Sequence, residues 1–416
     1  MNKLEEIIKE TDEEIKKNDL FQEIDNIENY YSDKIIQTFK KYQVSTTDFY
    51  GTTGYGYNDV GRDKIDLIFA DILDGEKALV RSQFISGTHA LTVTLFGLLR
   101  PGDTLLAISG KPYDTLDEVI GVKDNNSSLK SFNINFSYID LINNDFNYEK
   151  IKKYLENNKV KVIEIQRSRG YANRDSIDLD KIKKVVSLIK SIDNNIIVMV
   201  DNCYCEMTSI LNPISREIGC DIMVGSLIKN LGGGIASNGA YVVGKSELVD
   251  LVSERLTVPG QGSEVGPSIN MNKEFLEGLY MAPHAVNSSL KTNIFASIIL
   301  NKLGFITNPK CNEKRNDIVL SIIFNDKDKL INFIQGIQEY SAIDNFVKPI
   351  PSDMPGYSNQ IIMASGSFTQ GSSIEISCDG PIISPYIAYL QGSLTYTYGR
   401  LAVINAIRKV LEYEEK

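Results

Sequence analysis

The sequence of 416 residues has no tryptophan, only two histidines, five cysteines and no long apolar run. So few cysteines, in an odd number, do not support a disulfide framework, and we expect a reducing cytoplasm. A zinc site would need cysteine ligands besides His89 and His284, and Cys203-x-Cys205 is shorter than the common C-x-x-C spacing. No stretch approaches the ~18 apolar residues of a transmembrane helix, and the N-terminus lacks the apolar core of a signal peptide. We therefore expect a cytoplasmic protein without a metal site or a membrane span.

The charge balance is acidic, since 44 Lys and Arg stand against 54 Asp and Glu, for a formal net charge of −10. Nucleic acids and anionic membrane surfaces are bound by clustered cations, so neither is expected as the main partner. The length exceeds that of one small core and predicts two or three domains.

Hydrophobic periodicity divides the chain into three parts. Residues 1–45 are predicted to be a helical segment, because apolar residues recur at helix spacing between charges. Residues 46–285 alternate helical and extended patterns, which predicts an α/β domain with a mostly parallel central sheet. Residues 286–416 are predicted to form a smaller C-terminal α+β domain. The predicted strands are 78–84, 104–108, 160–165, 196–200, 221–224 and 240–243, and the predicted helices of this α/β domain are 65–73, 89–99 and 179–192.

Three predicted strand ends carry residues suited to a ligand, which in open α/β sheets binds at the carboxyl ends of the strands. The first is Ser86-Gly87-Thr88-His89, between a strand and an apolar helix. Free backbone N–H groups and the positive end of the helix dipole suit a phosphate there. The alternative is that Ser86 or Thr88 only caps the helix.

The other two strand ends contribute an acid and an amine. Asp201 directly follows the apolar run 196–200. A buried carboxylate at this place needs a cationic or hydrogen-bonding partner, which a ligand could supply. The alternative is a structural role, in which Asp201 caps a helix or pairs with an arginine. Lys229 lies close after the next strand, between Ser226 and the glycines 232–234. Desolvation would lower the pKa of this lysine and make it a nucleophile toward an aldehyde, whereas a solvated lysine is an ordinary surface charge.

Neither of two common nucleotide-binding motifs is present. The glycines after Lys229 do not fit G-x-G-x-x-G, because the last position, counted from Gly232, is Ser237. A P-loop is also absent from the sequence. A nicotinamide-dependent enzyme is therefore not favoured.

Along the chain, the candidate phosphate site at 86–89 is followed by Asp201 and then, 28 residues later, by Lys229. This order resembles that of the fold-type I enzymes that use pyridoxal 5′-phosphate (PLP). Among these, the chain is similar to the methionine γ-lyase-like branch often labelled aluminium-resistance proteins, relatives of cystathionine β- and γ-lyases. The resemblance covers about residues 30–410. It is carried by GTTGYGYNDVGR at 51–62, RSRGY at 167–171, VDNCY at 200–204, GSLIKN at 225–230, PGQG at 259–262 and QGSS at 370–373.

The resemblance implies a PLP-dependent transferase-like fold (aminotransferase fold-type I) and a role for each matched residue. Lys229 corresponds to the lysine that carries PLP as a Schiff base, and Asp201 to the acid that pairs with the pyridine nitrogen. His89 holds the place of the ring that stacks on the cofactor, usually a tyrosine, so an acid–base role and simple packing are both open to it. The other matched cofactor positions are Ser86, Gly87, Thr88 and Ser226, with Tyr55 or Tyr57, and also Arg62, reaching the phosphate of a neighbouring subunit.

An arginine is expected to hold the carboxylate of an amino-acid substrate, because its planar fork matches that group. Family members commonly carry one shortly after an Asp-Gly-Pro turn, whereas this chain continues from Asp379-Gly380-Pro381 with two isoleucines. Each remaining arginine can instead form a structural ion pair. The candidates for substrate binding are Arg167, Arg169 and Arg400, with Arg174 as a fourth.

The resemblance implies a PLP-dependent carbon–sulfur lyase that eliminates at the β- or γ-carbon of a sulfur-containing amino acid such as cystathionine or methionine. The alternative is a PLP-dependent aminotransferase or another amino-acid lyase, and a further one is a PLP-fold scaffold without catalysis. The resemblance also implies a homodimer or homotetramer with cross-subunit active sites, acting in cytoplasmic amino-acid metabolism.

Overall fold

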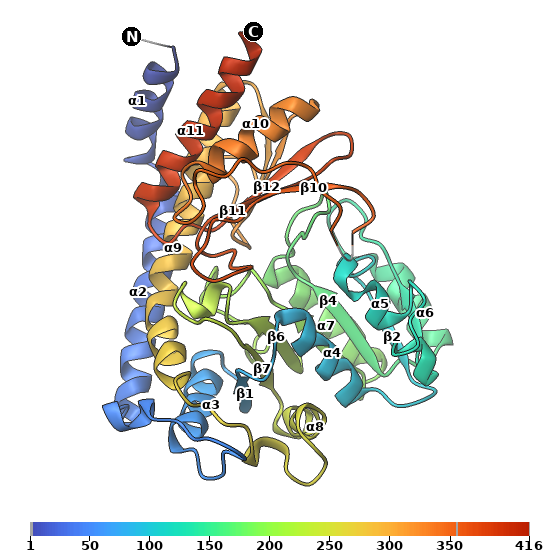
Figure 1. Ribbon diagram of the computed structural model, residues 1–416. Helices are drawn as coiled ribbons and strands as arrows, with labels where there is room; N and C mark the ends of the chain where they lie inside the picture. The colour runs from blue at the N-terminus through green and yellow to red at the C-terminus, as the bar shows by residue number, and fades with distance from the viewer. Residues whose placement is uncertain (1–2, 355–356, 416) are drawn as a thin grey trace.

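The chain folds around two β-sheets that lie one above the other, beside the long helices α2 (Asp19–Lys41) and α9 (Asn272–Lys302) (Figure 1). The computed structural model describes residues 3–354 and 357–415. A seven-stranded sheet occupies the lower part of the view, and a five-stranded sheet lies above it, near both chain ends. Within the described ranges, no helix is long and apolar enough to cross a membrane.

The large sheet contains β1 (Lys77–Arg81), β2 (Thr104–Ala107), β3 (Asn135–Tyr138), β4 (Val162–Gln166), β5 (Ile197–Asp201), β6 (Ile222–Ser226) and β7 (Ala240–Gly244). The strand order is β1-β7-β6-β5-β4-β2-β3. Strands β2 to β6 are parallel, and only β7 is antiparallel to both of its neighbours. All six predicted strands are confirmed within a few residues of their predicted ends. β3 was not predicted, because this edge strand is only half-buried and has no apolar run.

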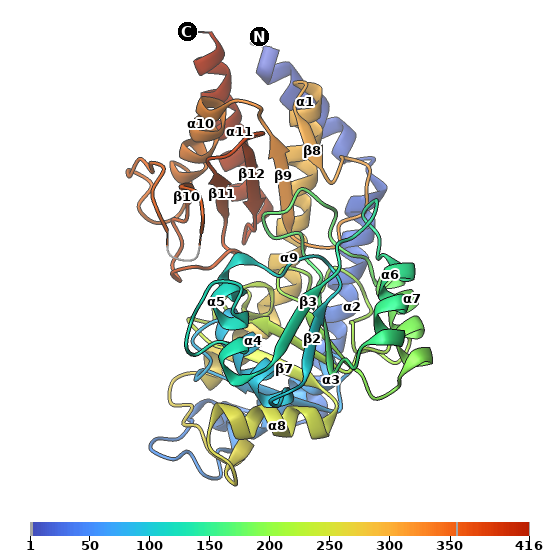
Figure 2. The ribbon, with the colours of Figure 1, turned by 90° about the vertical axis from the view of Figure 1, so that its right-hand side faces the viewer.

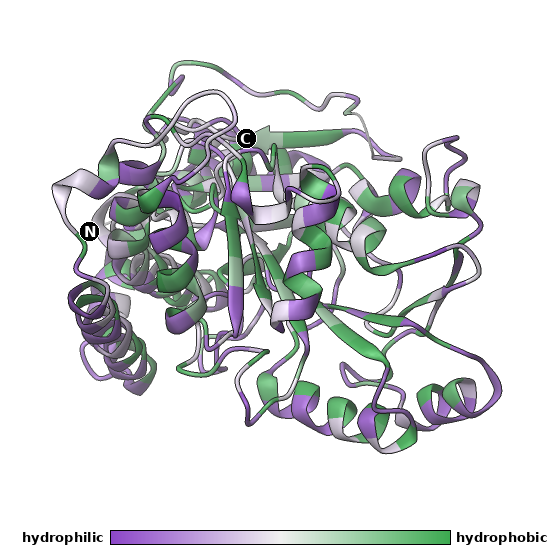
Figure 3. Cartoon of the chain, turned by 90° about the horizontal axis from the view of Figure 1, so that it is seen from below, coloured by the Kyte–Doolittle hydropathy of each residue, from purple (hydrophilic) through white to green (hydrophobic). Residues whose placement is uncertain are grey.

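Helices cover both faces of the large sheet. They are α3 (Val60–Ile72), α4 (Gly87–Leu98), α7 (Leu179–Ile192) and α8 (Ser246–Leu256), with α5 (Asp117–Ile120) and α6 (Tyr148–Asn157) towards one edge. Because side chains alternate along a strand, Val198 and Val200 of β5 share a core with α3, α7 and α9. Ile197 and Met199 share the opposite core with α4 and α8. The surrounding helices turn hydrophilic residues outward (Figure 3), and all three helices predicted for this domain are confirmed.

The smaller sheet is entirely antiparallel, with the order β10-β11-β12-β9-β8. Its elements are β8 (Ile306–Asn308), β9 (Val319–Ile323), β10 (Ile361–Ala364), β11 (Ser377–Pro381) and β12 (Ile387–Gln391), covered by α10 (Lys327–Gln338) and α11 (Tyr396–Glu414). Figure 2 shows this sheet above the large one. Leu4 and Ile7 of α1 (Lys3–Ile15) join its core. The predicted fold class, a mostly parallel central sheet with a smaller C-terminal α+β part, is confirmed.

Helix α9 connects the two parts of the molecule. Its residues Val286 and Leu290 belong to the core of the large sheet, while Phe295 and Ile299 belong to the core of the smaller sheet. The helix runs without a break through residue 285, where the sequence pattern suggested a boundary. The division into 1–45, 46–285 and 286–416 stays a prediction.

Candidate active site

The N-terminus of α4 forms one wall of the candidate site. The Ser86 hydroxyl accepts a hydrogen bond from the backbone N–H of His89 (3.1 Å), so the predicted cap is confirmed. The N–H groups of Gly87 and Thr88 belong to the first helical turn and have no acceptor within the helix. A Cβ on Gly87 would lie 3.2 Å from the Ser226 Cβ and 3.4 Å from the Cys203 sulfur. Glycine therefore lets the end of α4 approach the end of β6 closely.

Ser226, the last residue of β6, carries a buried hydroxyl that has no hydrogen-bond partner among the described residues. Leaving such a group unpaired costs about 1–3 kcal/mol. A ligand oxygen placed between Ser226 and the first turn of α4 would satisfy both the hydroxyl and the free N–H groups. This pair of features fits a phosphate.

Lys229 is partly buried beyond the end of β6, with its ammonium nitrogen 3.9 Å from the centroid of the Tyr204 ring. Within the described residues no carboxylate lies at ion-pair distance from it. Burial lowers the pKa of Lys229, but Cys203, Tyr204 and Asp201 raise it, and the net direction is upward. The expectation of a lowered pKa is therefore wrong for this form of the protein, because the surrounding acidic groups outweigh desolvation.

Asp201 ends β5 and is buried beside Lys229. Its Oδ1 accepts a hydrogen bond from the backbone N–H of Cys203 (3.1 Å). Burial raises its pKa, while Lys229 and the Cys203 N–H lower it. The chain continues from β5 into turns, so Asp201 caps no helix, and it forms no ion pair with an arginine among the described residues. Its carboxylate is free to meet a cationic ligand atom.

Lys229 and Asp201 border one small cavity of about 50 Å³ between the two sheets. Val319 of β9 and Gln391 of β12 bring the smaller sheet to its wall. His89 does not line this cavity. The residues that do are Tyr113, Gln166, Ser168, Gly170, Tyr171, Asp201, Cys203, Tyr204, Lys229, Val319 and Gln391.

His89 and Thr88 face other partners. The Nδ1 atom of His89 accepts a hydrogen bond from the backbone N–H of Ile85 (3.1 Å), and burial lowers the pKa of His89. Its ring packs edge-on against Phe84, with 6.1 Å between the ring centroids. The hydroxyl groups of Thr88 and Thr115 are hydrogen-bonded at 3.1 Å. The stacking role predicted for His89 stays a prediction, and the geometry favours the aromatic residue Tyr113.

Tyr113, which was not predicted from the sequence, lies in the loop after β2, and its backbone N–H donates to the Gln166 side chain (2.8 Å). Its position after a strand is the same signal that identified Asp201 and Lys229. The hydroxyl groups of Tyr113 and Tyr357 form a short hydrogen bond. Tyr113 therefore connects the ends of β2 and β4 to the smaller part of the molecule.

Asp379 of β11 contacts two of the residues that line the cavity. Tyr171 (2.8 Å) and Gln391 (3.0 Å) both donate hydrogen bonds to its Oδ2. Burial raises the pKa of Asp379 to about 6, against the lowering effect of these two hydrogen bonds. The contact joins the loop after β4 to the smaller sheet at the cavity that Lys229 also lines.

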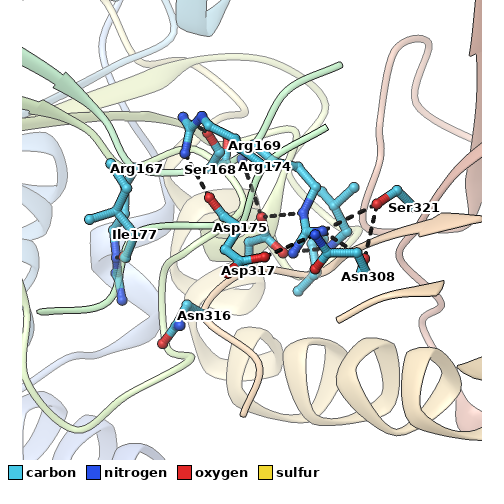
Figure 4. Close-up of polar contacts among 12 residues, drawn as sticks. Arg167, Ser168, Arg169, Arg174, Asp175, Ile177, Asn308, Asn316, Asp317 and Ser321 are labelled. Carbon is cyan, nitrogen blue, oxygen red and sulfur yellow. Dashed lines mark hydrogen bonds and ion pairs between the residues drawn. The ribbon is translucent and has the colours of Figure 1, made fainter. Parts of the chain in front are cut away.

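Two of the predicted substrate-binding arginines, Arg167 and Arg169, have partners inside the protein (Figure 4). The Arg167 guanidinium donates to the Ile177 and Cys205 carbonyls and to the Asn202 side chain. Arg169 forms a fully buried ion pair with Asp317 (3.4 Å), and its Nη1 donates to Asn308 O (2.6 Å) and Ser321 Oγ (3.2 Å). Only its Nη2 is buried without a partner.

Arg400, the third predicted substrate-binding arginine, lies on α11 and forms an ion pair with Asp12 of α1 (2.6 Å). Its guanidinium also lies over the Phe295 ring, 5.3 Å from the centroid. It lines neither the Lys229 cavity nor the cavity next to it. These contacts give Arg400 a structural role.

Tyr55 and Tyr57 lie on an exposed loop before α3. Their rings stack on each other with centroids 5.7 Å apart, and the residues are 70% and 52% exposed. Arg62, which we also expected to reach a neighbouring subunit, is instead buried and donates to the carbonyl oxygens of Gly56 (2.6 Å) and Gly266 (3.0 Å). Arg62 thus holds the loop in place, and the two tyrosines remain available to a neighbour.

Glu164 in the middle of β4 was not singled out from the sequence. Its carboxyl group is buried, and neither oxygen has a hydrogen-bond partner among the described residues. Burial, with a contribution from Asp201, raises its pKa to about 8, and Arg174 opposes this shift. Glu164 is therefore mostly protonated at neutral pH. The sequence feature that could have identified Glu164 is the presence of an acidic residue inside the apolar run 160–165.

The geometry defines a class of proteins: an α/β fold with a partly buried lysine, an acid and a helix N-terminus with free N–H groups at the carboxyl edge of a mostly parallel sheet. The family model for methionine γ-lyase matches residues 4–411, and the chain belongs to this family. The resemblance inferred from the sequence motifs is thereby confirmed.

Relatives of similar length support the assignment. The uncharacterized protein YnbB of Bacillus subtilis is 46% identical over 412 residues, covering 98% of this chain and 97% of that protein. A solved structure from Listeria monocytogenes, described as a candidate cystathionine β-lyase involved in aluminium resistance, is 43% identical with a TM-score of 0.94 and covers 98% and 100% of the two chains. One from Clostridium novyi, described as a carbon–sulfur lyase involved in aluminium resistance, is 42% identical with a TM-score of 0.94, covering 99% and 96%.

A more distant structure shows how widely the fold is shared. The PLP-dependent protein YhfS of Escherichia coli is 17% identical, with a TM-score of 0.63 over 94% of this chain and 97% of that one. At this identity the likeness concerns the fold alone. The fold is that of the fold-type I enzymes, as predicted.

Proposed function

We propose that this protein binds PLP and cleaves a carbon–sulfur bond in a sulfur-containing amino acid, by elimination at the β- or γ-carbon, yielding a keto acid, ammonia and a thiol. The observation that carries the proposal is that Lys229 and Asp201 share one cavity, while the unpaired Ser226 hydroxyl lies against the free first turn of α4, which also approaches the cavity residue Cys203. Membership of the methionine γ-lyase family and the descriptions of the solved relatives support the same reaction class.

The residues present fit the cofactor. The N–H groups of Gly87 and Thr88, with the Ser86 and Ser226 hydroxyls, would hold the phosphate, and Asp201 would hold a proton on the pyridine nitrogen. When bound at Lys229, PLP supplies an electron sink for the charge that develops at the substrate α-carbon. Tyr113 lines the cavity and would cover the ring, in place of His89.

Lys229 would move the proton at the substrate α-carbon. The neutral amine takes this proton, and the resulting ammonium can pass it on to the carbon chain. The Tyr204 ring, 3.9 Å from the nitrogen, stabilises the ammonium form by a cation–π interaction. The cavity is small, about 50 Å³, which leaves little room for water beside the charge that would develop on the substrate.

Arg169 would hold the α-carboxylate of the substrate. Of the predicted arginines Arg167, Arg169 and Arg400, it alone borders the larger cavity next to Lys229. Its Nη2 has donors without a partner, while the ion pair with Asp317 fixes the guanidinium.

A substrate panel tests the proposed reaction. PLP-loaded protein is incubated with cystathionine, cysteine, methionine and homocysteine, and keto acid, ammonia and thiol are measured. We expect the three products in equal amounts from at least one substrate, and none from Lys229→Ala protein. Absence of pyruvate, 2-oxobutyrate and thiol from all four would refute the lyase. Pyridoxamine phosphate with keto acid but without thiol would identify an aminotransferase instead.

We further propose a homodimer or homotetramer in which Tyr55 or Tyr57 reaches the phosphate of the neighbouring subunit. The exposed, stacked tyrosines next to a buried Arg62 support this arrangement. All five cysteines are free, which is consistent with a cytoplasmic location.

Subunit mixing tests the shared site. Lys229→Ala protein and a Tyr55→Ala/Tyr57→Ala double variant are each expected to have little activity. Mixed under conditions that exchange subunits, they should regain activity, because hybrid dimers contain one intact site. The mass of the active species is measured by light scattering. An active monomer, or no recovery in verified hybrids, contradicts the arrangement.

A further inference from the structure

A second cavity of about 600 Å³ adjoins the one that contains Lys229. The two share Tyr113, Gln166 and Tyr171 as lining residues. The larger cavity is built by the loops that follow β2, β3 and β4, so it lies at the same edge of the sheet as Lys229. These loops contribute residues 109–114, 140, 141, 143, 144, 169 and 171–174.

Arg174 borders this cavity and has no acid at ion-pair distance among the described residues, although the more distant Asp317 raises its pKa. Its Nη1 donates to the Asp175 carbonyl (2.9 Å), and its Nη2 donates to the carbonyls of Gln166 (2.9 Å) and Ser168 (2.5 Å) (Figure 4). These contacts fix the guanidinium at the end of β4, but carbonyl groups carry no net charge. Burial lowers the pKa of Arg174 to about 10, so the group is still cationic at neutral pH.

The other two cations that border the cavity are already paired. Lys111 binds Asp114 (3.3 Å) and Asp117 (2.9 Å), and Arg169 binds Asp317. Within the described residues Arg174 has no such ion pair. A buried charge without a counter-ion is costly unless a ligand supplies one. With the free Nη2 of Arg169 assigned to the α-carboxylate, Arg174 is therefore the cation of this cavity that is available to a second anion.

An acid on the same cavity completes a dipolar pattern. Asp140, in the loop after β3, borders the cavity and forms no hydrogen bond or ion pair among the described residues. A ligand with one carboxylate and one ammonium group would match both Arg174 and Asp140. Asn143, Asn144 and Asn173 line the same cavity, and their amides suit polar groups.

We propose that this cavity binds the far end of the substrate, beyond the sulfur atom, and selects amino-acid thioethers whose leaving thiol carries a carboxylate. A substrate whose α-carbon lies at Lys229 would extend past Tyr113 and Tyr171 to reach Arg174. A short alkyl thiol would leave the Arg174 charge unmatched. The inference rests on the proposed lyase function and names the substrate class of that site, with Arg174 as the residue that determines it.

A pair of matched probes tests the selection. S-(2-carboxyethyl)cysteine and S-propylcysteine have the same reacting part and similar length, but only the first ends in a carboxylate. We expect unaltered, PLP-loaded protein to favour the carboxylate compound by about ten- to a hundredfold in kcat/KM, the range of a charge-assisted hydrogen bond. The difference should lie mainly in KM, because the contact is the same in the bound and reacting states.

The variant arm uses Arg174→Gln, with Arg174→Lys as the conservative variant and Arg255→Gln, on α8, as the matched arginine control. The preference is expected to disappear in Arg174→Gln, return in part in Arg174→Lys and persist in Arg255→Gln. Equilibrium binding of both probes is measured by calorimetry alongside turnover, and thermal melting shows whether each variant is folded. If Arg174→Gln does not fold, the proposed selection is tested by the ratio of kcat/KM for the two probes in the unaltered protein, and equal values overturn it.

The outcomes separate the inference from the function on which it rests. Turnover of both probes at equal kcat/KM, or a preference that survives in folded Arg174→Gln, overturns the selection and leaves the lyase intact. Tighter binding of the carboxylate probe, lost in Arg174→Gln, without turnover of any sulfur amino acid overturns the lyase and supports the anion site.

Discussion

Replacing Lys229 by alanine is expected to abolish covalent attachment of PLP and to lower turnover by about two to four orders of magnitude, the usual contribution of a positioned base. The reason is that Lys229 is the lysine that the Tyr204 ring and the end of β6 hold in the cavity with Asp201. Borohydride reduction of unaltered protein, digestion and mass spectrometry should place the pyridoxyl group on the peptide that contains Lys229.

The matched control is Lys273→Ala, because the Lys273 side chain is 65% exposed on α9 and its nearest acid is Glu277 (3.8 Å). This variant should keep the label, the visible absorption of the bound cofactor and the turnover of unaltered protein. A pyridoxyl group on any other lysine, or near-normal turnover of Lys229→Ala, would show that the site has been assigned to the wrong residue.

The second large effect concerns stability. The pKa of a glutamate in the unfolded chain is near 4.5, whereas burial raises the pKa of Glu164 to about 8 in the folded protein. Below 4.5 both states are protonated, and the contribution of Glu164 to stability is fully present. As the pH rises through 8 this contribution is lost, because the folded protein must then hold a buried charge. The free energy of unfolding should therefore fall between pH 4.5 and 8.

Urea unfolding at several pH values, with and without the Glu164→Leu substitution, measures this effect. The variant should be more stable than unaltered protein by about 1–3 kcal/mol at pH 8, since an unpaired buried polar group is removed, and its stability should vary less with pH. Glu149→Leu, at an exposed position of α6, is the control and should retain the original slope. Identical pH profiles for unaltered and Glu164→Leu protein would mean that the carboxyl group is solvated.

Much of the fold could be predicted from local patterns. The strands that were predicted are those with apolar runs buried on both faces, such as Val162–Gln166 and Ile197–Asp201. The edge strand β3 has no such run and was not predicted. Helix α9 contributes apolar residues to both hydrophobic cores. Because the helix is continuous, the helical periodicity of its sequence does not show where one core ends and the other begins.

The residues of the site could likewise be predicted only where a local sequence pattern marks them. Asp201, Ser226 and Lys229 each lie at or close after the end of a strand, where a sequence pattern can be recognised. Asp379 and Gln391 enter the cavity region from the smaller sheet, and no local pattern links them to a lysine more than a hundred residues earlier. The direction of the Lys229 pKa depends on Cys203 and Tyr204, whose proximity only the folded chain reveals.

Helix α9 has a consequence for how the protein unfolds. Its 31 residues contribute Leu290 to one hydrophobic core and Phe295, little more than one turn later, to the other. Melting of either core would expose one side of the same continuous helix and weaken its packing on the other. The two sheets are thus coupled into one cooperative unit, and the cavity between them persists as long as that unit is folded.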